Sequence, residues 1–118
     1  MPPGWPAVVR PPDAPNWEGT AVNWLFDLCP PDYRGYPVLA RHPALLAWLA
    51  GHHLDGALHA ARRALATARG ELGDIVPPQV LNEALEVVES EQARILAAQR
   101  GLALVSQALR GIRFVPRL

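Results

Sequence analysis

The chain has 118 residues, half of them hydrophobic, and its 11 arginines balance 11 acidic residues, so the net charge is zero with histidine neutral. This length and composition predict a single domain with a substantial apolar core. General nucleic-acid binders need a basic excess to neutralise phosphates, and a neutral chain argues against that class.

The cysteine content and the N-terminal residues bear on the compartment. Cys29 is the only cysteine, so the chain cannot form an internal disulfide and nothing indicates an oxidising compartment. The opening "MPPGWPAVVRPPDAP" lacks the charged start and apolar run of a signal peptide. The apolar stretches are also too short to span a bilayer. We expect a soluble cytoplasmic protein with no membrane partner.

Proline divides the chain into an irregular part and a helical part. Ten of the 13 prolines lie in residues 1–43, and two long proline-free stretches follow, 44–76 and 79–115. Because proline removes a backbone donor and breaks helix interiors, we expect the first third to be largely irregular. Residues 1–15 are expected to be flexible or to adopt a polyproline conformation.

A short helix is predicted over residues 16–29. Asn16 suits the N-cap, Glu18 favours the positive end of the helix, and apolar residues recur at helical spacing until Pro30. The next segment, "DYRGYPVLARHP", predicts a loop or a short extended piece lying against the core.

Two long helices are predicted over residues 43–72 and 78–110, with 111–118 as a tail. Their apolar residues alternate at spacings of four and three over about four heptads, which is typical of coiled-coil-like packing. The seams comprise Ala47, Gly51, Leu54, Leu58, Ala61, Leu65, Ala68 and Leu72, and Leu81, Ala84, Val88, Glu91, Ile95, Ala98, Leu102, Val105 and Leu109. The short connection predicts an antiparallel hairpin, and hence an all-α fold.

The charges agree with one register for this hairpin. Folding at residues 73–78 places Leu72 opposite Leu81. Glu91, the only charged residue in the seams, then lies opposite Ala61. Arginines close the first helix and glutamates open the second at the same end of the hairpin: Arg62, Arg63 and Arg69, and Glu83, Glu86 and Glu89. Both sets also suit the helix dipoles.

The end of the hairpin away from the turn carries more apolar surface than one neighbouring helix can cover. The excess residues are Leu45, Leu46, Trp48 and Leu49, and Leu96, Ala97, Ala103 and Leu104. The tryptophan-rich N-terminal third, a second copy of the chain, or both must pack there. We predict a homodimer with symmetric contacts, in the form of a four-helix bundle. Its predicted interface comprises Ala50, Ala57, Ala64, Leu96 and Leu104.

The stretch "HHLDGALH", residues 52–59, is the strongest candidate for chemistry. Asp55 and His59 are four residues apart, a spacing that can place two ligands on one metal, with His52 nearby. A structural site needs about four ligands, and the facing helix offers Arg94, which repels a cation. We interpret the stretch as a solvated helix face; a metal site and a pH-sensitive contact are the alternatives. We expect no metal and no cofactor.

Each of three further features has a structural and a functional interpretation. Cys29 is either a half-buried structural thiol or a nucleophile without an evident base. Glu91 either sets the register or pairs with an arginine, or it is a catalytic carboxylate. The arginines of the C-terminal end, Arg110, Arg113 and Arg117, either solubilise the tail or bind phosphate or an acidic partner.

The sequence therefore favours a small non-enzymatic interaction or adaptor protein that acts through helical packing surfaces on an unknown protein partner. We predict no catalytic residue. The first alternative is a metal-dependent or acid–base enzyme that uses His52, Asp55, His59 and Glu91. The second alternative is a nucleic-acid accessory protein that uses the tail arginines.

Overall fold

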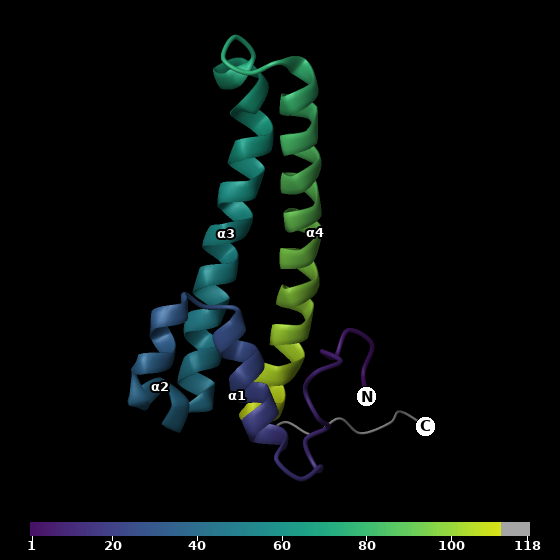
Figure 1. The fold of residues 1–118 in the computed structure, drawn as a ribbon. Helices are drawn as coiled ribbons and strands as arrows, with labels where there is room; N and C mark the ends of the chain where they lie inside the picture. The colour runs from purple at the N-terminus through teal and green to yellow at the C-terminus, as the bar shows by residue number, and fades with distance from the viewer. Residues whose placement is uncertain (112–118) are drawn as a thin grey trace.

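The predicted antiparallel helical hairpin is confirmed in a computed structural model that describes residues 1–111 (Figure 1). The elements are α1 (Trp17–Asp27), a 3₁₀ helix η1 (Pro31–Gly35), α2 (Pro37–Arg41), α3 (Pro43–Leu72) and α4 (Pro78–Leu109). Residues 1–111 contain no strand. The packing of α3 against α4 is the most extensive in the fold.

Both long helices begin at a proline, Pro43 or Pro78, whose fixed φ and missing N–H suit the first helical position. Contacts between the helices fix the expected register. Gln99 Nε2 of α4 donates to Asp55 Oδ1 of α3 at 2.9 Å, and a Leu102 methyl group lies 3.6 Å from where a Cβ on Gly51 would be.

The apolar seam of α4 is rotated slightly from the one that the spacing predicted. Leu81, Leu85 and Val88 face α3, whereas Ala84 and Glu91 are exposed. The predictions that Ala84 and Glu91 belong to the seam are therefore wrong. Burying leucine removes more apolar area from water than burying alanine and needs no desolvated carboxylate, so this rotation is favoured.

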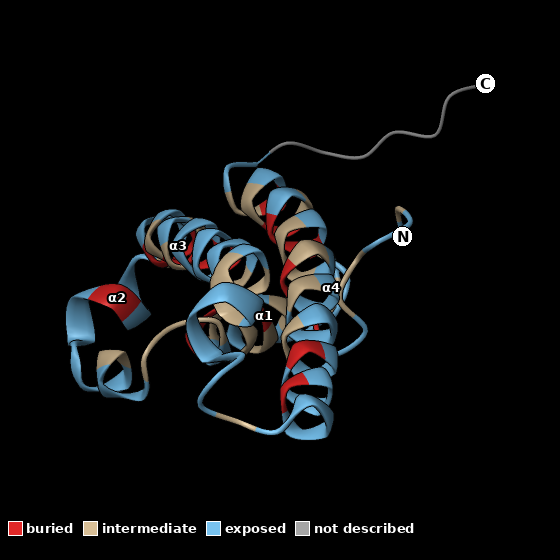
Figure 2. Cartoon of the chain, turned by 90° about the horizontal axis from the view of Figure 1, so that it is seen from above, coloured by how far each residue is buried: buried red, intermediate tan, exposed pale blue. Residues whose placement is uncertain are grey.

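Helix α1 crosses the hairpin at the end away from the turn and contacts both α3 and α4 (Figure 2). Its buried residues are Ala21, Leu25 and Phe26. Asn16 stands at the N-cap position as expected, but its backbone is left-handed (φ 59°) and its side chain makes no capping hydrogen bond.

The segment between α1 and α3 was expected to be a loop or an extended piece, and that prediction is wrong. It forms two short helices, η1 and α2, which begin at Pro31 and Pro37. Proline is pre-organised for the first helical turn, so the same residues that end one helix start the next. Leu39 of α2 is buried in the core shared by α1, α3 and α4.

Residues 1–15 form successive turns packed on α1 and α4, in place of the expected polyproline run. Val9 is buried with Ala21 and Val105, and the Trp5 indole N–H donates to the Val9 carbonyl at 2.8 Å. The close approach depends on Gly101, since a Cβ there would lie 2.9 Å from Cγ of Pro6.

The molecule thus has two regions, which we call the base and the arm. The arm consists of residues 57–72 and 78–96 with the turn between them, and among residues 1–111 the two long helices are each other's main neighbours there (Figure 1). The base contains everything else, with α1, α2, η1 and the N-terminal turns packed around the remaining parts of α3 and α4.

Candidate interaction surface

The two adjacent histidines of "HHLDGALH" make contacts within the fold. The His52 ring packs edge-on against Trp48, with ring centroids 4.7 Å apart, and remains exposed. His53 Nε2 lies 2.9 Å from the Tyr33 hydroxyl, and the two rings pack edge-on. His53 therefore ties the long helix α3 to η1.

The other candidate ligands do not converge. Asp55 accepts its hydrogen bond from Gln99, eight residues or about 12 Å of helix rise from Glu91. His59 is exposed. No group of three or more His, Cys, Asp or Glu residues in the described part of the chain is arranged to hold a metal ion.

Glu91 forms an ion pair along its own helix. Arg94 donates from Nε and Nη2 to the two carboxylate oxygens, at 2.9 and 2.6 Å. These hydrogen bonds and the positive charge of Arg94 lower the pKa of Glu91 below its ordinary value. Pairing with an arginine was one of the two structural interpretations of Glu91, and an exposed carboxylate with a lowered pKa is poorly suited to general acid–base chemistry near neutral pH.

Cys29 is half-buried beside the core cluster of the base. Burial raises the pKa of its thiol. Nucleophilic cysteines carry a lowered pKa instead, so the environment of Cys29 matches the structural interpretation.

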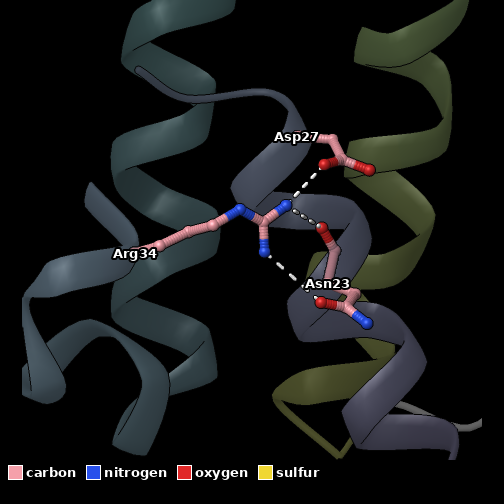
Figure 3. Close-up of polar contacts among 3 residues, drawn as sticks. All are labelled: Asn23, Asp27 and Arg34. Atoms are coloured by element: carbon pink, nitrogen blue, oxygen red, sulfur yellow. Dashed lines mark hydrogen bonds and ion pairs between the residues drawn. The ribbon is translucent and has the colours of Figure 1, made fainter. Parts of the chain in front are cut away.

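A polar cluster in the base was not found from the sequence (Figure 3). Arg34 of η1 donates to the side-chain and main-chain oxygens of Asn23 at 3.3 and 3.4 Å and pairs with Asp27. Its guanidinium also lies over the Phe26 ring, 5.2 Å from the centroid. Because these groups satisfy one another, the cluster fastens η1 to α1, and an open hollow lies beside it.

The arm carries an exposed apolar surface that we call the arm face: Ala57, Ala64, Val80, Ala84 and Val87. On α3 its residues are seven positions apart, and on α4 they follow spacings of four and three, so each set forms a line along one side of its helix. All five residues are exposed. The alanine line was recognised from the sequence. The valine line was missed, although its heptad spacing beside the seam was a usable signal.

The two lines lie on the same face of the hairpin, because each continues into residues that α1 covers. Ala50, seven residues before Ala57, is 0 % exposed in a cluster with Leu25 of α1. Val105 lies 18 residues, or about five turns, after Val87 and is 0 % exposed in a cluster with Ala21 of α1. Val87 itself is 66 % exposed. The arm face is therefore the uncovered continuation of the α1 binding surface.

The opposite side of the hairpin is polar. Asp55 stands two positions from Ala57 and Arg69 five from Ala64, so both side chains point away from the arm face. They hydrogen-bond across the helices, to Gln99 and to Asn82 respectively. The arm thus has a buried seam and, on one outer side, the exposed apolar residues of the arm face, whose line on α4 continues at the same spacing into the ion pair of Glu91 and Arg94.

The remaining residues of the predicted interface have neighbours in the chain itself. Ala50 is enclosed in the core, which leaves Ala57 and Ala64 as the open members of that stripe. Leu96 is half-buried against the core cluster. Leu104 is half-buried, and one of its methyl groups lies 3.7 Å from where a Cβ on Gly4 would be.

A second group of exposed apolar residues lies in the base. It comprises Tyr36, Val38, Leu45 and Trp48, of α2 and its N-cap and of the start of α3. The predicted excess of apolar surface here is therefore only partly covered by the N-terminal third, since Leu46 is fully buried but Trp48 is 54 % exposed.

Two of the tail arginines, Arg113 and Arg117, lie outside the described residues, while Arg110 is exposed directly after α4. Within residues 1–111, no helix combines the length and apolar character needed to cross a membrane. Comparison with protein-family models, with curated proteins and with solved structures finds no match to this chain.

Proposed function

We propose that the chain is a non-enzymatic cytoplasmic interaction protein that works as a homodimer through its arm face. One observation carries the proposal. Ala50 and Val105, which continue the two lines of the arm face into the base, are fully buried in clusters that include residues of α1, whereas the five residues of the arm face are exposed.

The chemistry of the arm face suits a helical neighbour. Fully burying a valine contributes roughly 1.5–3 kcal/mol, and each copy offers two, Val80 and Val87. The small side chains of Ala57, Ala64 and Ala84 let a neighbouring helix approach closely. A dimer formed in this way completes a four-helix arrangement around the arm, as α1 completes the packing around the base.

Less supports the alternatives. An enzyme built on His52, Asp55, His59 and Glu91 would need these residues to meet, and their contacts hold Asp55 and Glu91 apart. A nucleic-acid accessory role rests on the tail arginines and on a chain of zero net charge.

The proposal is tested by measuring molar mass with light scattering during size-exclusion chromatography. We expect the unmodified chain to be a dimer and Ala57→Glu to be a monomer, because the substitution puts an unpaired charge in the apolar contact. Arg63→Glu is the control, since Arg63 is an exposed residue of the same helix outside the arm face. A monomeric unmodified chain, or equal effects of the two variants, would contradict the proposal.

A further inference from the structure

We propose that residues 1–12, which we call the strap, are a displaceable cover over a groove between α1 and α4, and that this groove binds a proline-rich segment of a partner protein. The inference concerns the base and goes beyond the function proposed for the arm face. Three observations support it: the way the strap is held, the groove that lies beneath it, and the place that its proline occupies.

The strap is held on the helices by few buried contacts. Val9 is its only buried residue, with 3 % of its surface exposed. The turns of the strap are closed from within, as by the hydrogen bond from Val9 N–H to the Pro6 carbonyl at 3.1 Å. Arg10 N–H donates to Thr20 Oγ1 of α1 at 3.0 Å. A segment that buries so little apolar surface opens locally at a smaller free-energy cost than the core does.

The groove beneath the strap does not depend on the strap for its shape. Ala21 of α1 and Val105 of α4 are both 0 % exposed, in a small cluster that Val9 closes. A separate core cluster holds α1 on α3 through Leu25 and Phe26, and its buried members all lie outside the strap. Opening of the strap therefore uncovers apolar side chains without releasing the helices that carry them.

The proline of the strap occupies a place that suits this residue type. Gly101 of α4 is buried, and a Cβ there would lie 2.9 Å from Cγ of Pro6 and 3.3 Å from Cη2 and Cζ2 of Trp24. The Pro6 ring and the Trp24 ring thus both border the bare backbone of Gly101. Grooves lined by aromatic residues dock proline-containing segments, whose restricted backbone lowers the entropy cost of binding. We therefore expect the groove to recognise a proline followed, three positions later, by a valine such as Val9.

A segment from a partner protein must compete with the strap for the same contacts. Because the strap belongs to the same chain, its effective concentration at the groove is high, and the groove stays closed to weak ligands. A partner opens it only with a segment that binds more tightly or is present in excess. The strap is then an autoinhibitory contact as well as a part of the fold.

Binding of a labelled peptide with the sequence of residues 1–15 to the full chain, followed by fluorescence anisotropy, tests the proposal. Val9→Asp weakens the chain's own strap, because it puts an unpaired charge at a buried site, and it leaves the groove residues of α1 and α4 unchanged. Val8→Asp is the matched control, since the neighbouring Val8 is 68 % exposed. We expect the peptide to bind the Val9→Asp chain at least about tenfold more tightly than the Val8→Asp chain. A peptide that itself carries Val9→Asp should bind neither chain.

Equal affinity for the two chains, or no binding to either, would overturn the proposal. Loss of helix content in the Val9→Asp chain by circular dichroism would overturn it as well, because the groove would then not outlast the strap. If the strap is instead exchanged between two copies of the chain, excess peptide would lower the molar mass of the unmodified chain in light scattering. That result would contradict a separate partner.

Hydrogen exchange of the unmodified chain tests the opening of the strap without any substitution. The amides of Val9 and Arg10 should exchange faster than that of Val105, at a rate that low concentrations of urea do not change, because a local opening exposes little new surface. Exchange of the strap amides only through global unfolding, at the rate of Val105 and with the same dependence on urea, would contradict a displaceable strap.

Discussion

The base and the arm are built on the same two helices with the same apolar spacing, yet they differ in how completely they are buried. In the base, Leu46 and Val105 are fully buried because α1 and the N-terminal turns close the groove between the helices. In the arm, Leu65 and Val88 lie in the seam but remain partly exposed. Two helices cover one stripe of each other, and a third element is needed to exclude water from a whole face.

The largest expected effect compares one leucine of α3 in the base with one in the arm. Leu46→Ala should lower the free energy of unfolding by about 3 kcal/mol, since it leaves a cavity in a fully enclosed site. If no second chain covers the arm, Leu65→Ala should lower the free energy of unfolding by less than about 2 kcal/mol, because part of the Leu65 side chain is already in water. Urea unfolding followed by circular dichroism measures both.

The same two variants also test whether a second copy covers the arm. If a second chain covers the arm, the cost of Leu65→Ala should rise with protein concentration towards that of Leu46→Ala. A cost that does not depend on concentration would mean that the arm stays uncovered.

The next largest effect contrasts a closely packed glycine of the base with an exposed glycine directly before the arm. Gly101→Ala should destabilise the chain by about 1–3 kcal/mol, since its Cβ would lie 2.9 Å from the Pro6 ring and 3.3 Å from Trp24 in the base. Gly56→Ala is the control, an exposed position near the start of the arm with no atom within 4 Å. Alanine should stabilise the helix there by up to about 1 kcal/mol. Similar effects at both positions in thermal unfolding would contradict the close packing of the N-terminal segment.

The smallest expected effect concerns the ion pair of the arm. The lowered pKa of Glu91 means that its pairing with Arg94 stabilises the folded chain above the ordinary glutamate pKa. This contribution is lost as the pH falls through the lowered value. Glu91→Gln should therefore reduce the unfolding midpoint slightly at neutral pH and not at all in acid, where both proteins are uncharged at this position. A difference that persists unchanged into acid would mean that the side chain acts through packing.

The sequence predicted the hairpin well because its signals are local and repeated. Proline marks both helix starts, the heptad spacing runs through both helices, and the register follows from the short turn. The rotation of α4 was harder, because Ala84 and Leu85 fit neighbouring positions of the same spacing and only the tertiary packing chooses between them. For "DYRGYPVLARHP", proline content suggested irregular chain, while each proline in fact begins a helical turn.

The sequence predicted only part of the candidate surface, because tertiary packing decides the rest. The stripe of Ala50, Ala57 and Ala64 was visible as a line along one helix, but the sequence does not say where α1 ends on it. The contacts of Arg34 with Asn23 and Asp27 join segments on either side of a proline pair, and no spacing rule relates them. Long-range packing of short elements decides both features.

The molar mass of the unmodified chain tests the central claim most directly, namely that a second copy covers the arm face. Light scattering during size-exclusion chromatography, repeated over a series of concentrations, should give twice the chain mass of 12.8 kDa. A mass that stays at 12.8 kDa at every concentration would contradict the account, and the arm face would then be open to a different protein or to water alone.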